Sequence, residues 1–157
     1  MPLRLGKIIS GGQTGVDRAA LDVALALGIP CGGWCPRRRL AEDSRIPDQY
    51  PLTETATEDY GVRTELNVLF SDATLLLTLG EVTGGTHFTR MCARHHHKPC
   101  LEVPLDAPLL PGAFQEWITN YEIRVLNVAG PRESHRPGQV YRLARQQLEQ
   151  LLKEVRE

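Results

Sequence analysis

The feature of the sequence that most limits its fold is a repeated order of apolar segment, glycine turn and amphipathic segment. The stretch IISGGQTGVDRAALDVAL begins with two isoleucines, continues through three glycines and ends in a segment with helical spacing. The apolar run TLLLTL is followed by GEVTGGT and another helical segment. Strands that alternate with helices favour a parallel sheet with helices on both faces. The predicted fold is therefore α/β: a doubly wound three-layer sandwich with a mainly parallel sheet of about five strands.

The hydrophobic pattern also gives boundaries for each expected element. Strands are expected at Lys7–Ser10, Ile29–Trp34, Ala73–Leu79, Cys100–Pro104 and Arg124–Ala129. Helices are expected at Val16–Leu27, Val62–Phe70, Thr86–His97, Pro111–Asn120 and Gln139–Val155. A long polar loop is expected from about Cys35 to Gly61. A chain of 157 residues is long enough for one sizeable core, so residues 1–157 are expected to form a single ligand-binding domain.

Composition and charge exclude several classes of protein. Hydrophobic residues make up 41% and charged residues 24%, as in ordinary soluble domains. The net charge of -1 gives no general attraction to nucleic acid or membrane, and no apolar run approaches the roughly 20 residues of a membrane span. The N-terminal segment lacks the apolar core of a signal peptide, and the four cysteines fit reduced thiols. We therefore expect a cytoplasmic protein without nucleic-acid or membrane partners.

Two glycine turns are expected at the carboxyl edge of the sheet, where ligands bind in open α/β folds. Each turn precedes a helix, whose free N–H groups and dipole favour an anion, and glycine lets a phosphate approach closely. The alternative is a tight turn with no ligand. The first turn contributes the candidate binding residues Gly11, Gly12, Gln13, Thr14 and Gly15. The second turn contributes Thr83, Gly84, Gly85 and Thr86. Asp17 is interpreted equally well as a helix cap or as part of this site.

Two further strand ends carry polar side chains. WCPRRRLAED offers an aromatic ring for stacking, arginines for clamping an oxyanion, and two carboxylates. The alternatives there are a core tryptophan and a solvated loop whose charges pair with one another. NVAGPRES adds an amide, a turn, an arginine and a hydroxyl. From these segments the candidate binding residues are Trp34, Arg37, Arg39, Glu42, Asp43, Asn127, Gly130, Arg132 and Ser134.

No metal site is expected from the histidines and cysteines. His95, His96 and His97 are consecutive, and neighbours on a helix point about 100° apart, so they cannot chelate one ion together. Cys31 and Cys35 lack the second cysteine pair that a zinc site of this type needs.

In the same order along the chain, SGGQTGVDRAALD, WCPRRRLAED, YPLTET, SDATLLLT, TGGT and NVAGPRES resemble the molybdenum cofactor carrier family. The resemblance extends from about Lys7 to the closing helix. It implies a Rossmann-like fold, circularly permuted relative to the lysine-decarboxylase-like cytokinin-activating hydrolases and the DNA-processing protein DprA. It also implies a homodimer or homotetramer, because relatives form dimers or tetramers. Glycine is usual in the family where this chain has Arg38 and Ser44.

The resemblance implies binding rather than catalysis. In the hydrolase relatives, a glutamate that assists N-glycosidic cleavage follows the turn that corresponds to TGGT, whereas this chain reads TGGTHFTR without a carboxylate. The expected function is a carrier or store of the molybdenum cofactor (molybdopterin) or of a related phosphate-bearing pterin or nucleotide, with no catalytic residue. Two alternatives stay open. One is a nucleotide or N-glycoside hydrolase that uses Glu42, Asp43 or Glu54, and the other is a nucleotide-sensing module.

Overall fold

The fold is organised around a five-stranded parallel sheet, seen in a computed structural model that describes residues 4–155. The strands stand in the order β2-β1-β9-β7-β8, and every neighbouring pair is parallel. Their bounds are Lys7–Ile9 (β1), Cys31–Gly32 (β2), Ala73–Thr78 (β7), Cys100–Pro104 (β8) and Val125–Ala129 (β9). All six residues of β7 are buried, as expected for a central parallel strand. The predicted parallel α/β architecture is confirmed.

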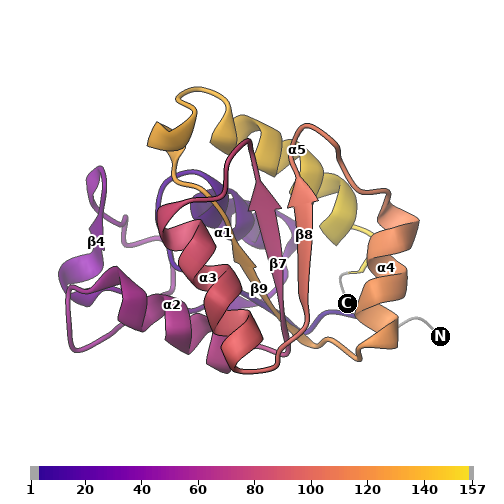
Figure 1. Ribbon diagram of the computed structural model, residues 1–157, viewed down its shortest axis with the longest axis horizontal. Coiled ribbons are helices and arrows are strands. Elements are labelled where there is room, and N and C mark those ends of the chain that lie inside the picture. The colour runs from indigo at the N-terminus through magenta and orange to yellow at the C-terminus, as the bar shows by residue number, and fades with distance from the viewer. Residues whose placement is uncertain (1–3, 156–157) are drawn as a thin grey trace.

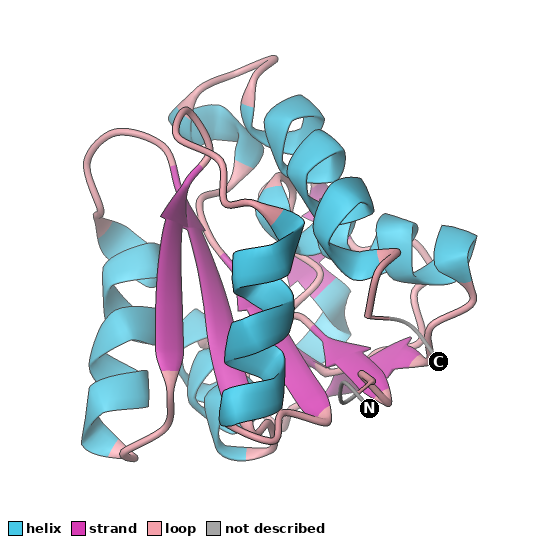
Figure 2. Cartoon of the chain, turned by 90° about the vertical axis from the view of Figure 1, so that its right-hand side faces the viewer, coloured by secondary structure: helices cyan, strands magenta, loops and turns pink. Residues whose placement is uncertain are grey.

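Helices cover both faces of the sheet. Their bounds are Val16–Leu27 (α1), Tyr60–Leu69 (α2), Gly84–His95 (α3), Pro111–Asn120 (α4) and Val140–Leu152 (α5). Helices α2 and α3 lie in front of the sheet in Figure 1 and α1 lies behind it, while the side view in Figure 2 separates the two helical layers. The main core lies between the sheet and the layer of α1, α4 and α5. Within residues 4–155, none of the helices combines the length and hydrophobicity that a membrane crossing requires.

Two helices begin earlier than the hydrophobic pattern predicts. Helix α2 begins at Tyr60 because the carboxylate of Asp59 accepts a hydrogen bond from the N–H of Gly61 at 2.8 Å. Helix α3 begins at Gly84, with Thr83 as its N-cap residue. The glycines of the second turn therefore belong to the first turn of a helix.

The prediction of one strand over Ile29–Trp34 is wrong. Of this segment, only Cys31–Gly32 pairs with β1 in the main sheet. Gly33 then adopts a φ of 130° and passes so close to the end of β1 that a Cβ there would lie 2.3 Å from the carbonyl oxygen of Ser10. The chain leaves the sheet at this glycine, and Trp34–Cys35 (β3) pairs instead with Thr53–Glu54 (β6) in a separate two-stranded sheet.

The segment predicted as a polar loop has its own small core. It contains a short 3-10 helix (Arg37–Arg39) and an antiparallel pair, Leu40–Ala41 (β4) and Ser44–Arg45 (β5). The guanidinium of Arg39 is buried and donates hydrogen bonds to the carbonyl oxygens of Ile46, Pro47 and Tyr50. Around it, a second cluster of buried side chains joins this segment to α1: Leu21, Cys35, Ala41, Ile46 and Tyr50.

The two positions at which glycine is usual in the family keep a conformation that favours glycine. Arg38 has a φ of 66° and Ser44 a φ of 87°. A residue with a side chain loses roughly 1–2 kcal/mol in this left-handed region. The loop thus keeps its backbone path, although neither position holds the residue best suited to it.

Candidate functional site

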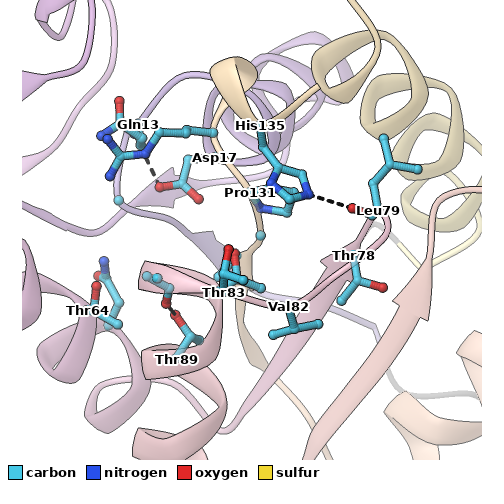
Figure 3. A pocket seen from close by; sticks show the side chains of 18 of the residues that line it. Gln13, Asp17, Thr64, Thr78, Leu79, Val82, Thr83, Thr89, Pro131 and His135 are labelled. Carbon is cyan, nitrogen blue, oxygen red and sulfur yellow. Dashed lines mark hydrogen bonds between the residues drawn. The ribbon is translucent and has the colours of Figure 1, made fainter. Parts of the chain in front are cut away.

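A cavity of about 320 Å³ lies at the carboxyl edge of the sheet, between the ends of β1, β7 and β9 and the helices α2 and α3 (Figure 3). It brings together these predicted binding residues: Gly11, Gln13, Thr83, Gly84, Gly85, Thr86, Asn127, Gly130, Arg132 and Ser134. The other predicted residues lie outside its lining: Gly12, Thr14, Gly15, Trp34, Arg37, Arg39, Glu42 and Asp43.

The second glycine turn is open toward this cavity. Helix α3 has no side-chain cap, and among residues 4–155 no acceptor pairs with the N–H groups of Gly84, Gly85 or Thr86. A Cβ added to Gly84 or Gly85 would meet no atom within 4 Å. Unpaired N–H groups and the positive end of the helix dipole together form a site for an anion.

The first glycine turn is filled by the protein itself. A Cβ on Gly11 would lie 2.0 Å from the guanidinium of Arg63, and one on Gly12 would lie 2.5 Å from the side chain of Leu52. A Cβ on Gly15 would lie 2.5 Å from the carbonyl oxygen of Pro131, which also accepts a hydrogen bond from the N–H of Val16. The start of α1 is therefore closed by packing.

Gln13 follows the first turn and presents an unpaired donor. Its Oε1 accepts hydrogen bonds from the backbone N–H groups of Thr14 at 3.1 Å and Glu42 at 2.9 Å. Its Nε2 is buried and has no hydrogen-bond partner in the part of the chain that the structure describes. Buried polar groups almost always have a partner, so an acceptor from outside the protein is expected here.

Asp17 and Arg63 form a buried ion pair in the cavity wall. The carboxylate of Asp17 lies 3.5 Å from the guanidinium of Arg63, and both side chains are less than 10% exposed. Arg63 also donates to the carbonyl oxygen of Gly11 at 2.8 Å, and Asp17 accepts from the N–H of Gln13 at 3.2 Å. Burial raises the pKa of Asp17, and the nearby guanidinium and N–H only partly oppose this.

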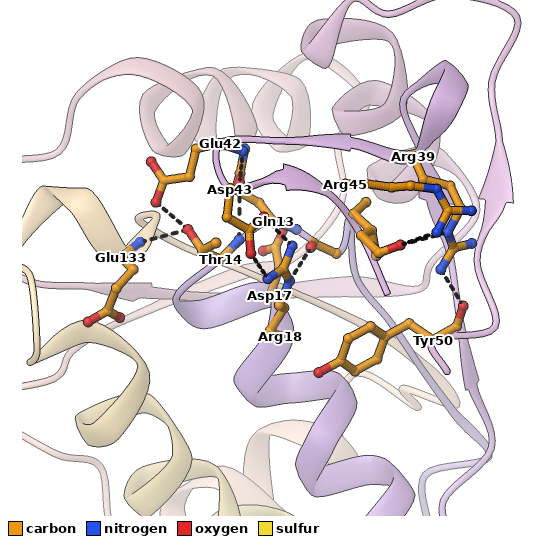
Figure 4. Close-up of polar contacts among 12 residues, drawn as sticks. Gln13, Thr14, Asp17, Arg18, Arg39, Glu42, Asp43, Arg45, Tyr50 and Glu133 are labelled. Carbon is orange, nitrogen blue, oxygen red and sulfur yellow. Dashed lines mark hydrogen bonds and ion pairs between the residues drawn. The ribbon is translucent and has the colours of Figure 1, made fainter. Parts of the chain in front are cut away.

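Glu42 joins three loops beside the cavity (Figure 4). Its carboxylate accepts hydrogen bonds from the hydroxyl groups of Thr14 and Ser134, the latter at 2.5 Å. Partial burial raises the pKa of Glu42. The hydrogen bonds from Ser134 and Thr14 together lower that pKa by more than burial raises it, so the net shift is downward. The hydroxyl of Thr14 in turn accepts from the N–H of Glu133 at 3.1 Å. Glu42 therefore holds the loops that follow β1 and β9 against the antiparallel pair of β4 and β5.

Two other carboxylates named in the sequence analysis, Asp43 and Glu54, also have protein partners. The carboxylate of Asp43 is paired with both terminal nitrogens of Arg18 (Figure 4), and Glu54 accepts from the N–H of Arg38 at 2.5 Å. Arg37 is exposed at the surface. The arginines that line the cavity are instead Arg63 and Arg132.

Two aromatic residues border the site without lining it. Trp34 is held through its backbone by the amide of Asn67, and its ring lies 5.8 Å from that of Phe70. The ring of Tyr60 contacts both Arg63 and Arg132, whose guanidinium carbons are 5.3 and 5.5 Å from its centroid. The cavity wall beside α2 is therefore held in place by the cation–π contacts of Tyr60 and by the hydrogen bonds between Asn67 and the backbone of Trp34.

Several lining residues were not identified in the sequence. These are Arg63, Thr64, Asn67, Thr78, Leu79, Glu81, Val82, Thr89, Ala129, Pro131 and His135. A ring nitrogen of His135 lies 2.6 Å from the carbonyl oxygen of Leu79 (Figure 3). The sequence places Arg63 on a predicted helix, but this position alone does not show that the side chain is buried in the site. Within residues 4–155, no cluster of three or more His, Cys, Asp or Glu side chains is arranged to hold a metal ion.

Comparison with known proteins places this geometry in a family. The sequence matches the circularly permutated YpsA SLOG family over residues 8–152, and the chain therefore belongs to that family. It is similar to the crystal structure of a provisionally named molybdenum carrier protein from Syntrophus aciditrophicus, with 46% sequence identity, 96% of each chain covered and a TM-score of 0.89. No curated protein matches the sequence. The predicted family resemblance and fold are confirmed.

Proposed function

We propose that this member of the circularly permutated YpsA SLOG family is a carrier or store that binds a phosphate-bearing small molecule at the N-terminus of α3. The observation that carries the proposal is the open start of that helix, where Gly84 and Gly85 present unpaired N–H groups to the cavity. Arg132 lines the same cavity and adds a positive charge. A similar protein is described as a molybdenum carrier, which makes molybdopterin or a related pterin phosphate the favoured ligand.

The residues present fit the phosphate and ring of such a cofactor better than its metal. The anion meets N–H groups that need no rearrangement, and the glycines leave room for close approach. No cysteine is among the residues that line the cavity, so the described part of the chain supplies no thiolate to molybdenum there. The protein would therefore hold the cofactor through its organic part. A nucleotide or a simple phosphate anion remains the alternative ligand class.

The identity of the ligand is tested by what the protein retains during purification. The protein is produced in cells that make the molybdenum cofactor and in a matched strain that cannot make it. Native mass spectrometry and metal analysis are then applied to both preparations. We expect an added mass and bound molybdenum only from the first strain. An unliganded protein from both strains, which also gains no thermal stability from pterin or nucleotide monophosphates, would contradict the proposal.

The position of Asp17 favours a second candidate, the nucleotide or N-glycoside hydrolase. Glu42, Asp43 and Glu54 lie outside the cavity lining, whereas Asp17 lines it and burial raises its pKa. A carboxyl group with a raised pKa is suited to proton transfer. We propose that its pairing with Arg63 makes it structural, and we expect negligible release of free base from nucleoside monophosphates after long incubation. Base release that disappears in Asp17→Asn would instead support the hydrolase.

We also propose that the protein is a cytoplasmic homodimer or homotetramer. All four cysteines are free thiols, in keeping with a reducing compartment. Large apolar side chains stand exposed on or beside α2 and α3: Val62, Leu69, Phe70, Phe88 and Met91. Burial of such a patch against a second copy would remove it from water. Light scattering should give a mass of two or four chains, and Phe70→Glu should lower it. A monomer at micromolar concentration would contradict this assignment.

A further inference from the structure

The amide of Gln13 has only one orientation that its surroundings allow. Two backbone N–H groups, from Thr14 and Glu42, point at the same side-chain atom, and only an oxygen can accept from both. If the amide were flipped, its NH2 group would face these two N–H groups, and three donors would meet without an acceptor. The Nε2 group is therefore fixed as a buried donor in a side chain that is 5% exposed and lines the cavity.

Gln13 lies on the opposite side of the cavity from the open helix start. It follows β1, whereas Gly84 follows β7, and β9 lies between these two strands. Neighbouring strands are about 4.8 Å apart, so the ends of β1 and β7, from which the two turns start, are separated by roughly 10 Å. Figure 3 shows Gln13 and Asp17 on one side and Thr83 on the other. One ligand would thus meet the helix start with its phosphate and Gln13 with a different group.

The burial of Nε2 limits the chemistry of that second group. A sugar edge carries several hydroxyl groups, each of which needs partners of its own when it is buried. A ring carbonyl or a ring nitrogen satisfies the donor without adding unpaired hydroxyl groups. An N-heterocycle such as a pterin or a purine carries acceptors of this kind on its edge.

We propose that Gln13 is a specificity-determining residue whose Nε2 donates to a ring acceptor at the end of the ligand opposite the phosphate. The ligand class is then a phosphate monoester that carries an N-heterocycle, rather than a sugar phosphate. This inference rests on the proposed phosphate site at α3. Loss of a donor to a buried acceptor should weaken binding of the ring-bearing ligand roughly 10- to 100-fold.

The test compares probes that share a phosphate and differ in the ring. Affinities of GMP, a pterin monophosphate and ribose 5-phosphate are measured by calorimetry for the wild type, Gln13→Met and the surface control Gln146→Met. We expect the wild type and the control to prefer at least one ring-bearing probe over ribose 5-phosphate. In Gln13→Met, the affinity for that probe should fall roughly 10- to 100-fold, to about the level of ribose 5-phosphate.

A second variant covers the case in which methionine disturbs the fold. Gln13→Glu keeps an oxygen for the two N–H groups but has no donor. The ratio of the affinity for the ring-bearing probe to the affinity for ribose 5-phosphate should therefore fall toward one, even if the new charge weakens both affinities. An unchanged ratio in either folded variant overturns the role of Gln13. A wild type that binds ribose 5-phosphate as tightly as both ring-bearing probes overturns the ligand class. If no phosphate probe binds the wild type at all, the α3 site itself is wrong.

Discussion

The two glycine turns look alike in sequence, and the structure makes them opposites. In the first turn, Gly12 and Gly15 have φ values near 80°, and protein atoms occupy the space beside each glycine. In the second turn, Gly84 also has a positive φ, of 52°, but the space beside Gly84 and Gly85 is empty and the helix start faces a cavity. A strand–glycine–helix pattern therefore has two causes: the chain needs glycine either to pack or to leave room for a ligand. Only the surrounding side chains separate the two.

The largest predicted effect is on the stability of the first turn. In Gly15→Ala the new Cβ would lie 2.5–2.8 Å from backbone atoms of residues 131–133, and alanine would be strained at a φ of 80°. We expect a loss of about 3 kcal/mol or more in the free energy of unfolding. Urea denaturation measures it.

Gly138→Ala is the matched control for this loss. Gly138 has a φ of 81°, but a Cβ there meets no atom within 4 Å, so only the backbone strain of about 1–2 kcal/mol remains. Equal losses in the two variants would show that packing against residues 131–133 does not explain the first turn.

A smaller effect of opposite sign is expected in the polar segment. Arg38→Gly and Ser44→Gly place glycine at φ values of 66° and 87°, and each should raise the free energy of unfolding by about 0.5–1 kcal/mol. Arg37→Gly is the neighbouring control, because Arg37 does not have a positive φ, and it should give no gain. Destabilisation by both Arg38→Gly and Ser44→Gly would mean that the strain argument for this loop is wrong.

An effect of similar size, which depends on pH, concerns the loops joined by Glu42. Because hydrogen bonds lower its pKa below the usual 4.5, ionised Glu42 stabilises the folded state above that pH, and the contribution fades as the pH falls through the lowered value. Glu42→Ala should thus be less stable than the wild type by up to about 1 kcal/mol at pH 7, with a smaller difference at pH 3. A difference that grows on acidification would contradict this reading. Glu122→Ala, at an exposed position, serves as the surface control.

The sequence predicted the fold well where local signals and tertiary packing agree. The apolar run of β7 and the spacing of α1 needed no distant partner to be recognised. The predicted second strand is wrong because Gly33 contacts the end of β1 and the chain leaves the main sheet there.

The candidate site was predicted less completely, because burial decides which charges reach the cavity. The sequence predicts Arg39 as an anion clamp, but its guanidinium donates hydrogen bonds to three carbonyl groups of its own loop. Arg63 is not predicted as a site residue from the sequence, although it lies buried beside Gly11 and Asp17. Both arginines sit in polar sequence contexts, and nothing local distinguishes them. The unpaired Nε2 of Gln13 could not be predicted either, because the orientation of this amide depends on the N–H of Glu42, which is 29 residues away in the chain.

The central claim is that the start of α3 is the anion site, and one pair of variants tests it most directly. Gly85 and Gly112 are each the second residue of a helix, and a Cβ on either meets no atom within 4 Å. Aspartate is favoured at both positions by the helix dipole, so Gly85→Asp and Gly112→Asp should be at least as stable as the wild type. Calorimetry with a pterin monophosphate should show affinity reduced at least about 100-fold in Gly85→Asp and unchanged in Gly112→Asp. Wild-type affinity in a folded Gly85→Asp protein would contradict the account.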